Sequence, residues 1–172
     1  MTVPLYKIFI FLDSCAIDSK DNLEKIAIDK IYLWEKVGAI VDMAPSVQEE
    51  INHPNTPSEV KRIVNKLGYT PVKPSLNEEE KKCLDQIKKI LAGNGDVRAI
   101  QKDADNVFEA YNNAANYFVT LDKRILKKRV QLQKLCSSSL TIVKPSELVK
   151  KYDWEFVNMK ALRKKRFYYG SR

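Results

Sequence analysis

Residues 8–18 read IFIFLDSCAID, and this stretch is the clearest indication of how the chain folds. Five apolar residues run without a break from Ile8 to Leu12, a pattern typical of a strand covered on both faces. Asp13 follows at once, although burying a carboxylate costs free energy unless the group is paired. The stretch therefore predicts a buried strand whose end delivers an acidic side chain to a defined place.

Short apolar segments alternate with helical patterns along the rest of the chain. Strands are expected at 5–12, 38–45, 116–122 and 140–145. Helices are expected at 19–36 (with Ser19 as N-cap), 45–54, 58–68, 77–95, 98–115, 123–134 and 145–152. This alternation predicts an α/β fold with three α/β/α layers around a mostly parallel central sheet.

The 172 residues are enough for one domain with a full core. We expect this domain to span residues 1–155, with a helical insertion at about 55–95. Residues 156–172 form a basic tail without a clear helical or strand pattern.

The charge of the chain points to a polyanionic partner. The net charge is +8, a basic cluster lies at 122–129, and no acid follows Glu155. The last thirteen residues supply six positive charges, those of Lys160, Arg163, Lys164, Lys165, Arg166 and Arg172. Nucleic acid is the natural partner for such a surface, although solvated lysines need no ligand. The tail is expected either to grip RNA or to pack back on the body as a strap.

The sequence gives no sign of a membrane or an oxidising compartment. No apolar run reaches the length of a membrane span, and no secretory signal pattern opens the chain. The three cysteines are widely spaced and suggest neither a metal-binding pair nor a disulfide framework. We therefore expect a cytoplasmic protein with no membrane partner.

A second aspartate also follows a predicted strand, because Asp122 ends the segment YFVTLD. In a parallel α/β sheet, ligands bind beyond the carboxyl ends of the strands, so Asp13 and Asp122 reach the same edge. Like charges held close together are unfavourable unless a cation lies between them. Hard divalent cations such as Mg²⁺ prefer oxygen ligands, so this edge is a candidate metal site.

Two helical segments bring further acids. QEEI contains Glu49 and Glu50, and KDADNV contains Asp103 and Asp105. A metal held by carboxylates alone suits the activation of water against a phosphodiester. Taken singly, each acid is explained as well by a helix cap or a solvated helix face. The spacing leaves open which member of each pair faces the metal.

Four segments resemble, in order, the motifs of the PIN domain, a nuclease fold of many toxin–antitoxin ribonucleases. The matching segments are IFIFLDSCAID, APSVQEEI, KDADNVFEAYNNAANYFVTLD and LTIVKPSELV, which together span residues 8–149. The third segment carries an aspartate followed after nineteen positions by the aspartate of a T-x-D strand end, which pairs Asp103 with Asp122. In the second segment, the aliphatic residue after the glutamate favours Glu50 over Glu49.

The resemblance implies a Mg²⁺- or Mn²⁺-dependent endoribonuclease that cleaves single-stranded or structured RNA. Its implied catalytic residues are Asp13, Glu50, Asp103 and Asp122, of which Asp13, Asp103 and Asp122 hold the metal. The implied partners are RNA, a cognate antitoxin and a second copy of the chain in a homodimer. Thr120 and Ser14 are candidate supporting hydroxyls. Many PIN domains have Asn where this chain has Cys15, a departure expected to weaken the hydrogen-bond support of Asp13.

Two other functions fit parts of the same pattern. A PIN-like fold can bind RNA without cutting it. A phosphatase of the haloacid-dehalogenase type also has a strand-end aspartate, but it needs a second aspartate where this chain has Cys15.

Overall fold

The computed structural model describes residues 3–43, 53–56, 58, 61, 68–69, 75–136 and 139–169, with side chains described as far as residue 160. The helices predicted at 45–54 and 58–68 fall largely outside these residues.

Five described strands form one sheet in which every pair runs parallel. The strands are β1 (Phe9–Leu12), β2 (Ile40–Met43), β3 (Gly68–Tyr69), β4 (Tyr117–Val119) and β5 (Thr141–Val143). Their order across the sheet is β3-β2-β1-β4-β5, so β1 occupies the centre. The predicted three-layer α/β/α fold with a parallel central sheet is confirmed.

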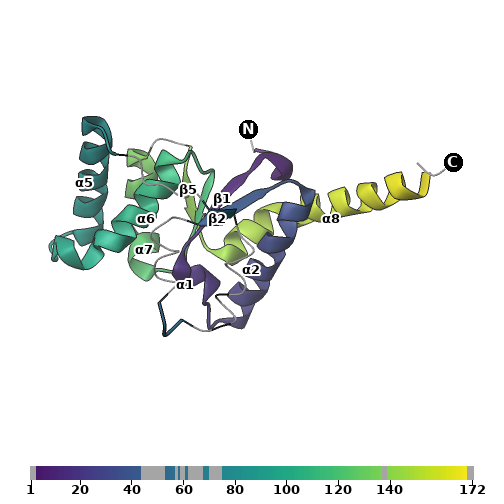
Figure 1. Ribbon diagram of the computed structural model, residues 1–172, viewed down its shortest axis with the longest axis horizontal. Coiled ribbons are helices and arrows are strands. Elements are labelled where there is room, and N and C mark those ends of the chain that lie inside the picture. Colours follow the sequence, from purple (N-terminus) through teal and green to yellow (C-terminus); the bar gives the residue numbers. More distant parts are fainter. Residues whose placement is uncertain are drawn as a thin grey trace.

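Helices cover the sheet on both sides (Figure 1). The described α-helices are α1 (Ser14–Ile17), α2 (Asn22–Trp34), α5 (Glu78–Ala92), α6 (Gln101–Asn112), α7 (Lys123–Leu135) and α8 (Pro145–Tyr169). Short 3-10 turns occupy Leu5–Lys7, Glu35–Val37 and Val97–Ile100. In Figure 1, α5, α6 and α7 gather to one side of the strands, and α2 packs with the first half of α8 on the other. No described helix is long and apolar enough to cross a membrane.

The core forms around the central strands β1 and β4, which are apolar along their whole length. Phe11, Leu12, Phe118 and Val119 are completely buried, as expected for strands that are covered on both faces. Trp34 of α2 packs edge-on against Tyr152 of α8, with ring centroids 5.9 Å apart. This contact brings α8 onto the same layer as α2.

Local sequence signals explain the starts of three helices, α2, α5 and α7. Asn77 and Glu80 form a capping box that begins α5, in which each side chain accepts a hydrogen bond from the backbone N–H of the other residue. The predicted cap of α2 is wrong, because Asp21 rather than Ser19 accepts the N–H groups of Leu23 and Glu24. Asp21 is a better N-cap than Ser19 because its carboxylate also interacts favourably with the positive N-terminal end of the helix dipole.

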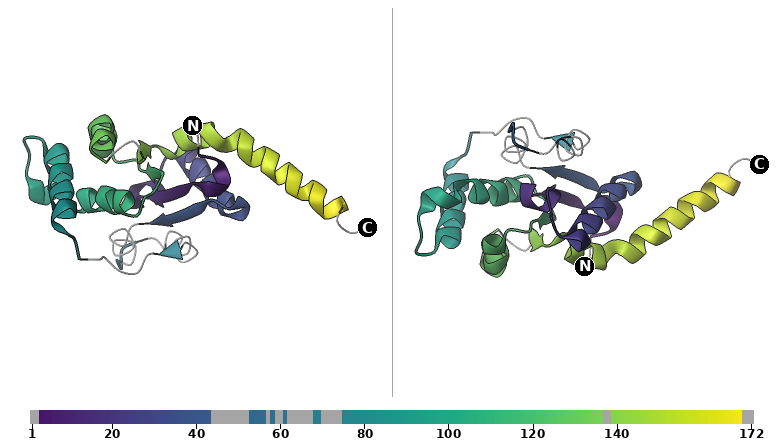
Figure 2. Two further views of the ribbon diagram at one scale, coloured as in Figure 1. Left: turned by 90° about the horizontal axis from the view of Figure 1, so that it is seen from above. Right: turned by 90° about the horizontal axis from the view of Figure 1, so that it is seen from below.

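Two predicted elements differ from the structure. The insertion at about 55–95 is not purely helical, because Gly68 and Tyr69 pair with β2 and add an edge strand. The helix predicted at 145–152 is too short, since α8 runs on to Tyr169 through most of the basic tail. Beyond the body, α8 projects alone (Figure 2), which contradicts the expectation of a strap in this part of the tail.

Candidate functional site

The carboxyl edge of the sheet brings Asp13 and the end of β4 together. Leu12 pairs with Met43 on one side and with Val119 on the other, so Asp13 is the first residue beyond the central strand. The Asp13 N–H then donates to the Val119 carbonyl at 3.0 Å, which holds the chain at this edge after the strand has ended. The sequence prediction that both segments reach one edge is correct.

The Asp13 carboxylate is 5% exposed and accepts hydrogen bonds at both oxygens. Thr120 Oγ1 donates to Asp13 Oδ2 at 2.6 Å, and Cys15 Sγ donates to the same oxygen at 3.0 Å. Asn106 Nδ2 of α6 donates to Asp13 Oδ1 at 3.2 Å. A buried carboxylate would be costly without such donors, and these donors orient it as well as stabilise it.

Cys15 supports Asp13, contrary to the expectation from its departure from the PIN pattern. The Leu121 N–H donates to Cys15 Sγ at 3.2 Å, and Thr120 Oγ1 lies 3.3 Å from the same sulfur. Burial raises the pKa of the Cys15 thiol to about 12, and the neighbouring Asp13 charge adds to the shift. The thiol therefore keeps its proton at neutral pH and can donate to the carboxylate.

Asp122 is joined to Asp13 through one hydroxyl. Thr120 Oγ1, which donates to Asp13, also accepts the N–H of Asp122 at 3.0 Å. The Asp122 carboxylate caps α7 by accepting the Ile125 N–H at 2.8 Å. Asp122 therefore has the structural role of a helix cap as well as a position at the candidate site.

Asp103 lies on the face of α6 that is directed toward the carboxyl edge of the sheet. Asn106 comes three residues later, so it shares a helix face with Asp103, and Asn106 contacts Asp13 directly. Arg124, in the first turn of α7, approaches Asp103 with an N–O distance of 3.7 Å. Asp105 points elsewhere, because it accepts a hydrogen bond from Gln101 Nε2 at 2.8 Å.

The structure thus brings the three predicted metal ligands to one edge but not into a closed cluster. Asp13 and Asp122 are linked by Thr120, and Asp103 adjoins them through Asn106 and Arg124. Within the described residues, no three acidic, histidine or cysteine side chains are close enough to form a ready metal site. Glu49 and Glu50 lie outside the described residues.

Sequence reasoning missed Asn106. An asparagine inside a helix is a weak helix former, so it attracts attention only when its position is unusual. Asn106 is 3% exposed and stands in a run of buried residues, Asn106 to Ala110, in the second half of α6. Its position one turn after Asp103 was the available signal.

Basic side chains extend from the candidate site along α7, the predicted basic helix 123–134. Lys123, Lys127 and Lys134 are exposed and share one face of the helix. Arg129 is engaged with Glu147 at 2.9 Å. The exposed lysines therefore form a basic stripe that begins one residue after Asp122.

A separate cavity of about 410 Å³ lies away from these acids. Its walls include Cys83 of α5, Tyr111 of α6 and the residues Ala114 and Ser139. Ala114 and Ser139 precede β4 and β5, so the cavity adjoins the amino edge of the sheet rather than the edge with Asp13.

No protein-family model matches the chain, and no curated protein matches its sequence.

Proposed function

We propose that this chain is a Mg²⁺- or Mn²⁺-dependent endoribonuclease of the PIN type. The observation that carries the proposal is the buried Asp13 carboxylate, held by donors from three other positions at the carboxyl edge of a parallel sheet. Core packing alone gives no reason to place a carboxylate there, whereas a site for a cation does.

The donor set fits a hard divalent cation. Asp13, Asp103 and Asp122 offer only oxygen atoms, and Mg²⁺ retains several waters while binding one or two protein carboxylates directly. A ready cluster of three ligands is therefore not required. When bound, such a cation supplies an acidified water and neutralises charge that develops on a phosphate.

The residues of the chain would divide the remaining work. The donors around Asp13 hold its carboxylate in one orientation. Arg124 offsets the charge of Asp103, which lowers the repulsion among the acids. Glu50 is proposed to orient the attacking water. The lysine stripe of α7 would hold the RNA backbone beside Asp122.

The test is cleavage of single-stranded and structured RNA with Mg²⁺, with Mn²⁺ and with a chelator. We expect cleavage that requires the cation and is lost in Asp13→Asn. Asp18→Asn is the matched control, since Asp18 is a nearby aspartate in an exposed ion pair with Lys20. Cation-dependent cleavage that survives in Asp13→Asn would contradict the proposed site.

A second candidate is an RNA-binding module that does not cut. It is favoured by the roles that two of the acids already fill, because Asp122 caps α7 and Asp103 pairs with Arg124. Binding of RNA without cleavage under any of these cation conditions would select this function.

A further inference from the structure

The two tryptophans of this chain lie in opposite environments. Trp34 is completely buried in the core, whereas Trp154 of α8 is 67% exposed. A tryptophan in solvent forgoes the large stabilisation that its burial would give. One exposed aromatic residue alone needs no explanation, so its surroundings decide whether it marks a binding site.

The acids on either side of Trp154 are both engaged with other elements. Asp153 pairs with Lys30 of α2 at 2.9 Å. Glu155 accepts the Leu5 N–H at 2.7 Å, which fastens α8 to the first turn of the chain. Neither carboxylate is therefore directed along the face that carries Trp154.

The face of α8 around Trp154 is instead basic and apolar. Lys150 precedes Trp154 by four residues and Val157 follows it by three, so all three lie on one side of the helix. Lys150 is exposed, and Val157 is 59% exposed. Within the described part of the chain, no ion pair of Lys150 is found.

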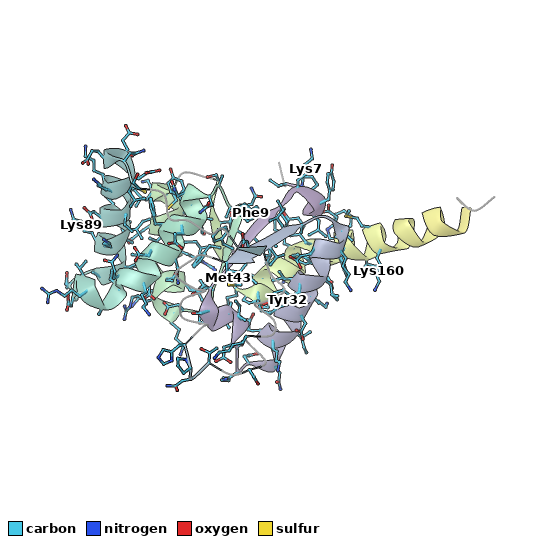
Figure 3. The ribbon with its side chains drawn as sticks, viewed as in Figure 1. Lys7, Phe9, Tyr32, Met43, Lys89 and Lys160 are labelled. Atoms are coloured by element: carbon cyan, nitrogen blue, oxygen red, sulfur yellow. The ribbon has the colours of Figure 1, made fainter. Side chains whose placement is uncertain are left out.

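This face leads to the part of α8 that leaves the body. Lys160 lies where the helix begins to project (Figure 3). The sequence then adds four cations between residues 163 and 166 and no acid. A flat aromatic ring thus stands at the base of a helix whose charge attracts polyanions.

We propose that Trp154 is a stacking platform for an unpaired base of single-stranded RNA, whose backbone then follows the basic part of α8. The choice of RNA rests on the proposed function, but the platform lies outside the candidate catalytic site. Aromatic rings bind bases through stacking while basic side chains follow the phosphates. The positive charge of α8 disfavours a second copy of the same helix on this face.

Because Trp154 is exposed and Trp34 is buried, a ligand that stacks on Trp154 can be followed by the fluorescence of the exposed ring. We titrate the full-length protein with oligouridylate of about 12 nucleotides, in chelator to prevent cleavage, and follow tryptophan fluorescence. Quenching of the emission from the exposed ring is expected, with no quenching from an abasic ribose-phosphate oligomer of equal length. Equal quenching by both oligomers would overturn the stacking.

Three variants locate the contact. Trp154→Ala should bind oligouridylate about 10-fold more weakly with an unchanged salt slope, and Trp154→Phe should restore most of the affinity. Leu23→Ala is the matched control, because Leu23 of α2 is 66% exposed and carries no stacking ring. Unchanged affinity in Trp154→Ala would remove Trp154 from RNA binding.

Other occupants of the face have their own signatures, and each would overturn the proposal. A second copy of the chain would change Trp154 fluorescence with protein concentration in the absence of RNA. If an acidic helical peptide is the occupant, it should bind Trp154→Ala less tightly than it binds the wild type. It should also fail to displace RNA that is bound to the wild type. Failure of RNA cleavage in the preceding experiment leaves this test intact, because binding is measured without a cation.

Discussion

Cys15 illustrates how much one side chain can do at the candidate site. Its thiol contacts Asp13 at the end of β1 and accepts the Leu121 N–H just beyond β4. It therefore ties together the two central strands where their backbone pairing ends. A thiol is a weak donor, but here its partner is an ionised group, and charge-assisted hydrogen bonds are the stronger ones.

We predict that Cys15→Ala lowers the free energy of unfolding by about 1–3 kcal/mol, because the partly buried Leu121 N–H loses its acceptor. Cys15→Ser should recover part of this loss, since a hydroxyl also donates and accepts. Chemical denaturation measures both values. Cys83→Ser on α5 is the control for loss of a half-buried thiol elsewhere, and equal losses at Cys15 and Cys83 would contradict a specific role.

The two aspartates of α6 should differ in their effect on activity. Asp103→Asn should reduce cation-dependent cleavage at least about 100-fold, by analogy with removal of a single electrostatic contact in an active site. Asp105→Asn should change it little, because Asp105 is bonded to Gln101. The measurement is the cleavage rate under saturating Mn²⁺. Equal losses at both positions would show that Asp105 also serves the site.

Among the elements, α8 has the clearest division of labour. Its first half is fastened at several points: Ser146 donates to Glu24, Tyr152 to the Val3 carbonyl, and Lys151 to the Tyr117 hydroxyl. The projecting half, by contrast, leaves the body in Figure 2. The first half of α8 should therefore contribute to the stability of the protein, and the projecting half to ligand binding.

Removal of residues 160–172 should leave the melting temperature nearly unchanged, because the fastened half of α8 remains. RNA binding should weaken, and its salt dependence should become flatter by about 0.7 per lost phosphate contact. Thermal melting and binding at several salt concentrations measure the two effects. A large fall in melting temperature with an unchanged salt slope would contradict this division.

The strands β1, β2, β4 and β5 were predictable because each lies in a short, mostly apolar segment of the sequence. Gly68 and Tyr69 were not, since a two-residue edge strand carries no such pattern and depends on its pairing with β2. The length of α8 was also missed, because the sequence of residues 156–169 has no clear apolar pattern at helical spacing. At the site, the acids were found through their strand ends, whereas Asn106 owes its role to a contact 93 residues away.

For the whole molecule, a bound cation should act as a stabilising ligand. The acids at the carboxyl edge come from β1, α6 and the start of α7, so a cation that joins them holds these elements together. At a concentration 100 times its dissociation constant, Mn²⁺ should add about 2.7 kcal/mol to the free energy of unfolding. For a chain of this size, the melting temperature should rise by about 5–10 °C.

The same titration of Asp13→Asn checks where the cation binds. We expect little or no rise in the melting temperature of this variant, whereas Asp18→Asn should behave like the wild type. A rise in Asp13→Asn equal to that of the wild type would place the cation elsewhere on the surface.

The order in which the chain is synthesised gives the Asp13 contacts a further consequence. Asp13 is translated before its donors Asn106 and Thr120, which follow 93 and 107 residues later. The full set of donors is therefore in place only after Thr120 has been translated and β4 has joined β1. For a protein proposed to cut RNA, this delay keeps the unfinished chain inactive while it is still attached to the RNA-rich machine that makes it.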